Sequence, residues 1–357
     1  MSQRMDREHP LWEIWLIEGL PDGHWAMLSK LHHCMADGVA GTQLYDVICN
    51  GGGRHHDPVE NQPPGDARLL VEALGDLAAN PVEQVRMAGR ALRRPGRWAT
   101  RAVSTVQGLL SYATALFPVA PTSLVGHVGR QRRYGVARAS LPDVIGVSRA
   151  FRVTVNDVVL AAISAAYRDL LLTRGERPTA GSVRSFVPVN VRDKGSRDVD
   201  NQISAMLPML PVDVGDPVER LSVVHRRLVE KKAGKESFAG AAVLSLARHE
   251  VFAPIAWGIR LAAHIPQRNI ITVTTNVPGP RRPLTLLGRE IIEIFPYVPI
   301  AMRLRTGIAI LTYRDHLAFG ITADFDGAPE VRLLADSIEL QVATLVEAAA
   351  HHAPLPK

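Results

Sequence analysis

The chain has 357 residues, a hydrophobic share of 46% and a formal net charge of +6 at pH 7. This length favours two domains, and the composition is typical of a globular protein with a large core. Every apolar run is shorter than the roughly 20 residues that span a bilayer, which excludes a transmembrane helix.

The N-terminal residues 1–8 are charged and have no apolar core, so they do not resemble a secretory signal. The two cysteines, Cys34 and Cys49, supply no disulfide framework, and we expect a cytoplasmic protein. The modest positive charge suits an anionic substrate such as CoA, or an anionic lipid surface. Basic residues are not interleaved with aromatic ones and no nucleic-acid module is recognisable, so nucleic acid is not an expected partner.

The first predicted elements form a β-hairpin that ends in two histidines. Residues 12–18 and 25–31 alternate apolar and polar side chains, as strands do, and residues 21–23 predict a turn between them. The second strand leads directly into His32 and His33, which open the pattern HHxxxDG. An imidazole held at a strand end titrates near neutral pH and can take a proton from an alcohol. Two buried structural histidines beside a turn are the alternative, which the full pattern disfavours.

The other residues of this motif allow several roles. Asp37 could orient the His33 ring, and Gly38 permits a tight turn or a close backbone approach. Cys34 is a candidate thiol nucleophile beside the histidines. Adjacent residues at a strand end point in opposite directions, however, which argues against a Cys34–His33 pair.

The next segments are a short helix, a loop and a basic helical region. We expect a helix at residues 38–48 and a polar surface loop to residue 66, whose pair His55-His56 is more typical of a solvated loop than of a metal site. Residues 67–115 have a helical pattern with an arginine-rich face and apolar residues that include a tryptophan. Such a helix suits a membrane or lipid-droplet surface, or it links two lobes with a solvated face; the two interpretations are compatible.

Beyond a proline-containing boundary at residues 117–122, strands and helices alternate without dinucleotide-binding or phosphate-loop glycines. The predicted strands cover residues 136–141, 182–191, 203–212, 270–277, 307–313 and 316–323. The predicted helices cover residues 143–150, 156–173, 216–232, 242–264 and 329–351. Thr154 or Asn156 can cap the second of these helices, so the Asn156-Asp157 pair has a sufficient structural reason to exist.

The segment HHCMADG at residues 32–38 resembles the active-site motif of the bacterial wax ester synthase/acyl-CoA:diacylglycerol acyltransferase family, a branch of the CoA-dependent acyltransferases. Further segments match landmarks of that family in the same order, namely HPLWE at 9–13, TVNDVVLA at 154–161, VPVNVR at 187–192 and TNVPGP at 275–280. The resemblance extends from His9 to the last predicted helix. It implies a two-lobed mixed α/β fold, and a first lobe that lacks the segment family members carry before PLW.

The resemblance divides the chain into three parts. Residues 1–66 are the remainder of an N-terminal lobe that carries HHxxxDG, residues 67–121 are a basic helical crossover, and residues 122–357 are a C-terminal lobe. The implied reaction transfers a long-chain fatty acyl group from acyl-CoA to diacylglycerol, or to a long-chain alcohol to form a wax ester. The thioester is already activated, so we expect neither a metal nor another cofactor. Peripheral contact with a membrane or lipid droplet is a further expectation.

The motif match also implies a role for each site residue. His33 is the general base toward the acceptor hydroxyl and then the proton donor to the CoA thiolate. His32 supports it, Gly38 permits the turn, and Asp37 holds the loop through a basic partner rather than acting in a dyad. The residues implied in substrate binding are Pro10, Leu11, Trp12, Asn156, Asp157 and Asn276.

Two other functions compete with this one. An incomplete first lobe would leave an open sheet edge near residues 12–31, and the chain would then be an inactive remnant or a lipid-surface binding protein. A condensation-type acyltransferase that uses carrier-protein thioesters also shares HHxxxDG. The PLW, NDVVLA and NVPGP segments argue against that second alternative.

Overall fold

The computed structural model describes residues 2–3, 5–6, 8–32, 45, 48–49, 119–190, 203–233 and 269–352. The motif residues 33–38 lie outside the described residues, as do the helices expected at 67–115 and 242–264. The domain boundaries expected near residues 66 and 121 therefore stay a prediction.

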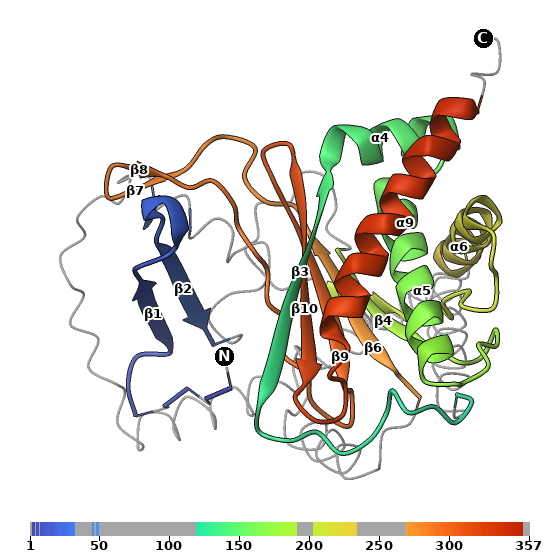
Figure 1. The fold of residues 1–357 in the computed structure, drawn as a ribbon, viewed down its shortest axis with the longest axis horizontal. Coiled ribbons are helices and arrows are strands. Elements are labelled where there is room, and N and C mark those ends of the chain that lie inside the picture. The colour runs from blue at the N-terminus through green and yellow to red at the C-terminus, as the bar shows by residue number, and fades with distance from the viewer. Residues whose placement is uncertain are drawn as a thin grey trace, which may run out of the picture.

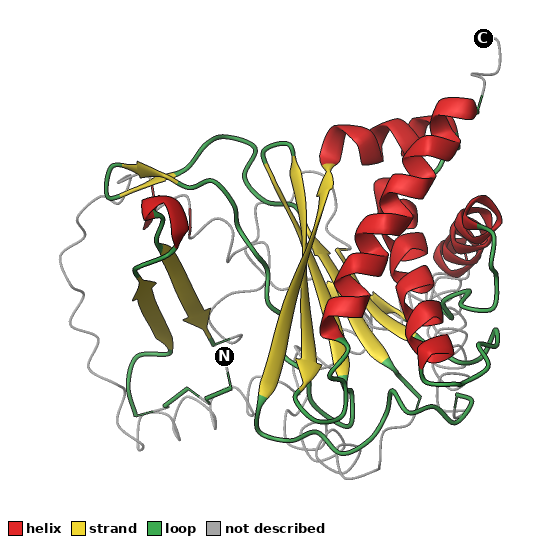
Figure 2. Ribbon diagram, viewed as in Figure 1, coloured by secondary structure: helices red, strands yellow, loops and turns green. Residues whose placement is uncertain are grey.

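Within the described residues, six strands form one mixed sheet in the order β3-β10-β9-β6-β4-β5 (Figures 1 and 2). The strands are β3 (Arg132–Ser140), β10 (His316–Asp324), β9 (Thr306–Tyr313), β6 (Thr272–Val277), β4 (Ser185–Asn190) and β5 (Ile203–Met206). β6 runs parallel to both of its neighbours, whereas β3, β10 and β9 are antiparallel, as are β4 and β5. The mixed α/β fold class predicted from the sequence is confirmed.

The described helices cover one face of this sheet (Figure 2). They are α4 (Leu141–Ala150), α5 (Val155–Thr173), α6 (Pro217–Ala233) and α9 (Val331–His351). Among the described helices, none is both long and apolar enough to cross a membrane by itself; α4 and α5 meet that criterion only as a pair bent by 101°.

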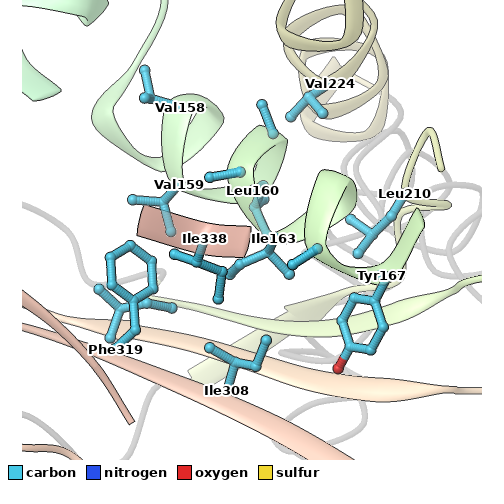
Figure 3. Packing of buried hydrophobic residues seen from close by; sticks show 14 of the residues in the cluster. Val158, Val159, Leu160, Ile163, Tyr167, Leu210, Val224, Ile308, Phe319 and Ile338 are labelled. Atoms are coloured by element: carbon cyan, nitrogen blue, oxygen red, sulfur yellow. The ribbon is translucent and has the colours of Figure 1, made fainter. Parts of the chain in front are cut away.

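The core lies between α5, α9 and the sheet. Figure 3 shows Val159 and Ile163 of α5 packed against Ile308 and Phe319 of the sheet and Ile338 of α9. All five side chains are fully buried. Each contributes roughly 1.5–3 kcal/mol through burial, before the cost of ordering the chain. This packing explains why the sequence of α5 is apolar around most of its circumference.

A buried group of hydroxyls fixes α5 on the sheet. The hydroxyl of Tyr167 lies 2.6 Å from Oγ1 of Thr272 on β6 and 2.8 Å from Oγ1 of Thr306 on β9. Burial raises the pKa of Tyr167 to about 12, so this phenol stays protonated at neutral pH. Because buried polar groups must be paired, these contacts set the position of α5 along β6 and β9.

An extended segment covers the opposite face of the sheet. Val298 and Ile300 lie against Gly307 of β9, and the carbonyl of Pro296 lies directly over Gly320 of β10. The hydroxyl of Tyr134 on β3 donates to the same carbonyl at 2.8 Å. Neither glycine has a side chain, which leaves room for the backbone of this segment at Gly320 and for its side chains at Gly307.

The N-terminal hairpin is also confirmed. β1 (Trp12–Ile17) and β2 (Ala26–Leu31) pair in antiparallel register, and a short 3₁₀ turn at Pro21–Gly23 lies between them. Some other predicted bounds were wrong, among them those of β3 and β5. β3 begins earlier than expected, because its arginines pair with the end of β10 although they show no apolar alternation. β5 ends at residue 206 rather than 212, since the prolines at 208 and 211 cannot donate to a ladder.

Candidate functional site

The PLW segment and the first motif histidine meet at the open end of the hairpin. Trp12 pairs with Leu31, and the backbone N–H of His32 donates to the carbonyl of Leu11 at 3.0 Å. The N–H of Trp12 donates in turn to the carbonyl of Pro10 at 2.7 Å. Two segments that stand twenty residues apart in the sequence are thus held side by side by backbone hydrogen bonds.

The other motif residues cannot be placed in the same way. His33, Cys34, Asp37 and Gly38 lie outside the described residues, so their roles stay predictions. The same holds for the pair His55-His56. Among the described residues, no group of three histidine, cysteine or acidic side chains is arranged to hold a metal ion.

Helical residues that follow the motif contact the C-terminal end of β9. Cys49 is buried with Leu284 and Tyr313, the last residue of β9, and Tyr45 packs against this cluster. The Tyr45 hydroxyl is also hydrogen-bonded to the hydroxyl of Ser29 on β2. The β2 strand that leads into the motif is therefore linked through Tyr45 to the cluster at the C-terminal end of β9.

Tyr313 also anchors the long connection from β6 to β9. Its hydroxyl accepts a hydrogen bond from the Leu284 N–H at 2.9 Å and donates to the Ile291 carbonyl at 2.8 Å. This connection carries the hairpin of β7 (Thr285–Leu286) and β8 (Arg289–Glu290), which the sequence analysis missed because two-residue strands show no periodicity.

At the same end of the sheet, two predicted substrate-binding residues come together. Asn156 lies in the first turn of α5 and Asn276 lies near the end of β6. Nδ2 of Asn276 donates to Oδ1 of Asn156 at 3.4 Å, and both residues are half-buried. The amide nitrogen of Asn156 makes no hydrogen bond with another described residue, so it remains a donor. The pair joins the NDVVLA and NVPGP segments, 120 residues apart in the chain.

Gly279 fixes the backbone just beyond Asn276. Its N–H donates to Oγ1 of Thr312 on β9 at 3.0 Å. A side chain at this position would overlap the carbonyl oxygen of Thr312. Glycine is therefore needed for the close approach, and the chain after β6 has little freedom to move relative to β9.

Thr154, one of the two caps predicted from the sequence, is the N-cap of α5, and Asp157 completes a capping box with it. Its backbone N–H donates to Oγ1 of Thr154 at 3.2 Å, and its Oδ2 accepts from the N–H of Thr154 at 2.8 Å, which makes a capping box. The same Oδ2 lies 2.8 Å from Nδ1 of His225 on α6. Sequence analysis missed His225, because no spacing rule relates it to a residue 68 positions earlier. The substrate-binding roles implied for Asn156, Asp157 and Asn276 stay predictions.

Comparison with known proteins shows which family this chain resembles. The model of the wax ester synthase/diacylglycerol acyltransferase catalytic domain matches residues 1–159, and the model of the C-terminal domain of the same enzymes matches residues 199–345. The Mycobacterium tuberculosis protein named "probable diacylglycerol O-acyltransferase tgs1" is 42% identical over 97% of this chain and 73% of its own length.

More distant relatives belong to the same family of acyltransferases. The O-acyltransferase WSD of Acinetobacter baylyi is 27% identical over 96% of this chain and 74% of its own. The solved structure of the wax ester synthase/diacylglycerol acyltransferase from Marinobacter aquaeolei VT8 superposes with a TM-score of 0.63. It is 25% identical, and the superposition covers 98% of this chain and 74% of that one.

Proposed function

This chain belongs to the wax ester synthase/diacylglycerol acyltransferase family, and on that premise we propose that it transfers a long-chain fatty acyl group from acyl-CoA to diacylglycerol. Long-chain alcohols, which give wax esters, are the second acceptor class, because the family and the Marinobacter enzyme carry both activities in their names. The observation that carries the proposal is the match of both family models to this chain, one of which spans HHxxxDG and the other NVPGP.

The proposed reaction needs a base, an oxyanion donor and exclusion of water. His33 removes the proton from the acceptor hydroxyl as it attacks the thioester carbonyl, and then protonates the departing CoA thiolate. The tetrahedral oxyanion needs preorganised donors, and the proposal assigns this role to the side-chain amides of Asn156 and Asn276, which contact each other. The thioester needs no further activation, so the proposal includes no metal and no covalent enzyme intermediate.

The test is CoA release from palmitoyl-CoA by the purified protein with diacylglycerol, with hexadecanol and without an acceptor. The proposal predicts release that depends on an acceptor and is fastest with diacylglycerol. Faster release with hexadecanol would make the chain a wax ester synthase. Absence of acceptor-dependent release would overturn the enzyme proposal and favour the alternative of a lipid-surface binding protein.

We also propose that the β7–β8 hairpin makes the peripheral contact with an anionic lipid surface. Leu287 at its tip is 80% exposed and has a φ of 52°, which is unfavourable for a bulky residue. The exposed Arg281 and Arg289 lie on the same connection, while Glu290 is paired with Arg314 at 2.5 Å. An exposed apolar tip, beside arginines that form no ion pair with another described residue, complements anionic headgroups. The basic helix expected at 67–115 is a second candidate outside the described residues.

This contact predicts a loss of lipid binding in Leu287→Ser. Because burial of a leucine contributes about 1.5–3 kcal/mol, we expect vesicle affinity to fall roughly 10- to 150-fold. Co-sedimentation with phosphatidylcholine vesicles that contain phosphatidylglycerol measures the change. Leu340→Ser is the matched control, since Leu340 is 62% exposed but lies on α9. Equal binding by the two variants would contradict the assignment of the hairpin.

A further inference from the structure

The carboxylate of Asp157 is held more firmly than a helix cap requires. Asp157 is only 2% exposed, although it lies in the first turn of a helix. Burial of a carboxylate is costly unless several donors pair with it. The capping box supplies the backbone N–H of Thr154, and His225 supplies a second donor to the same oxygen. His225 is the one described side chain from another element that bonds this carboxylate.

The His225 contact ties the first turn of α5 to α6, which lie next to each other in Figure 1. The Nδ1 atom of His225 reaches Asp157 from a ring that is 38% exposed to solvent. Asp157 directly follows Asn156, and both lie in the turn that faces the end of β6. A shift of this turn would therefore move Asn156.

The other half of the asparagine pair cannot follow such a shift. Asn276 is on β6, which is hydrogen-bonded to β9 as far as Val277. Gly279 then holds the chain against Thr312. The Tyr167 hydroxyl positions α5 further along the helix. At the first turn, His225 makes the one side-chain hydrogen bond to Asp157 from outside the helix cap among the described residues, and so it holds Asn156 at its distance from Asn276.

We infer that His225 is a positioning residue for acyl transfer, which holds Asn156 against Asn276 through the carboxylate of Asp157. This inference rests on the proposed function, in which the two asparagines act on the reacting groups. It assigns His225 no contact with substrate and no proton transfer. Its ring acts as a fixed donor, so an amide that donates from the same place can replace it.

The test compares His225→Ala with His225→Asn, whose Nδ2 can donate to Asp157 where Nδ1 did. Displacement of catalytic groups by a fraction of an ångström to 1 Å costs roughly 10- to 100-fold in rate. We expect a loss of this size in the kcat of His225→Ala, little change in the KM for palmitoyl-CoA, and recovery of most of kcat in His225→Asn. Val229→Ala is the control, because Val229 is 49% exposed on the same helix.

Amide hydrogen exchange provides a readout that needs no activity. The first turn of α5 should exchange faster in His225→Ala than in the wild-type protein, and at the wild-type rate in His225→Asn. Unchanged exchange in His225→Ala overturns the inference, as does an unchanged kcat. An inactive wild-type protein overturns the proposed function instead, and the exchange experiment still decides whether His225 holds the turn.

Discussion

The substitution His33→Ala is expected to reduce acceptor-dependent CoA release by about 10²- to 10⁴-fold, the usual contribution of a positioned general base. The imidazole removes the hydroxyl proton during attack, and His32 is the one other imidazole in the motif. The KM for palmitoyl-CoA should change little, because the proposed role is in the transition state rather than in binding the thioester. Steady-state kinetics with saturating acceptor measure both constants.

The control for this prediction is His24→Ala. His24 is an exposed histidine in the turn of the same hairpin, at the opposite end of β2 from the motif. It should keep wild-type kinetics. The rate of CoA release by His32→Ala should lie between the rates of His33→Ala and His24→Ala, because His32 is expected to support His33. Equal rates for His33→Ala and the wild-type protein would show that the motif histidine is not the base.

The substitution Gly320→Ala is expected to destabilise the protein by about 3 kcal/mol, which is at the upper end for overpacking. An added methyl group would overlap the carbonyl oxygen of Pro296 and approach the hydroxyl of Tyr134. Neither obstacle is the free end of a flexible chain: one is backbone, and the other is held by its hydrogen bond to that backbone. Urea denaturation measures the free energy of unfolding.

Gly146→Ala is the matched control, with an effect of the opposite sign. Gly146 lies inside α4, and a methyl group there would meet no atom within 4 Å. Alanine has the higher helix propensity by about 1 kcal/mol, so this variant should be slightly more stable than the wild-type protein. If both variants shift stability in the same direction, the segment at Pro296 does not lie on the sheet as described.

Much of the fold could be predicted because the signals were local. The hairpin follows from alternating side chains around a Pro-Asp-Gly turn, and α5 follows from a Thr154 cap before a long apolar run. The strands at the C-terminal end of the chain were also predicted nearly to the residue. These elements bury apolar side chains at regular intervals, which is the feature that periodicity detects.

The features that were missed depend on contacts between distant parts of the chain. The residues at the start of β3, from Arg132, form a strand because β10 pairs with them, although their side chains do not alternate between apolar and polar. The β7–β8 hairpin is too short to show a pattern. His225 reaches Asp157 only because α6 packs beside α5. For the candidate site, the sequence identified Asn156 and Asn276 by family resemblance, and only the fold showed that they meet.

The most direct test of the proposed function follows the acyl group itself. Palmitoyl-CoA labelled in the acyl chain is incubated with purified protein and diacylglycerol, and both free CoA and labelled ester are quantified by mass spectrometry. Acyl transfer predicts one molecule of triacylglycerol for each CoA released, with both lost in His33→Ala. Release of CoA with labelled free palmitate in place of ester would identify a thioesterase and contradict the proposed acyltransferase function.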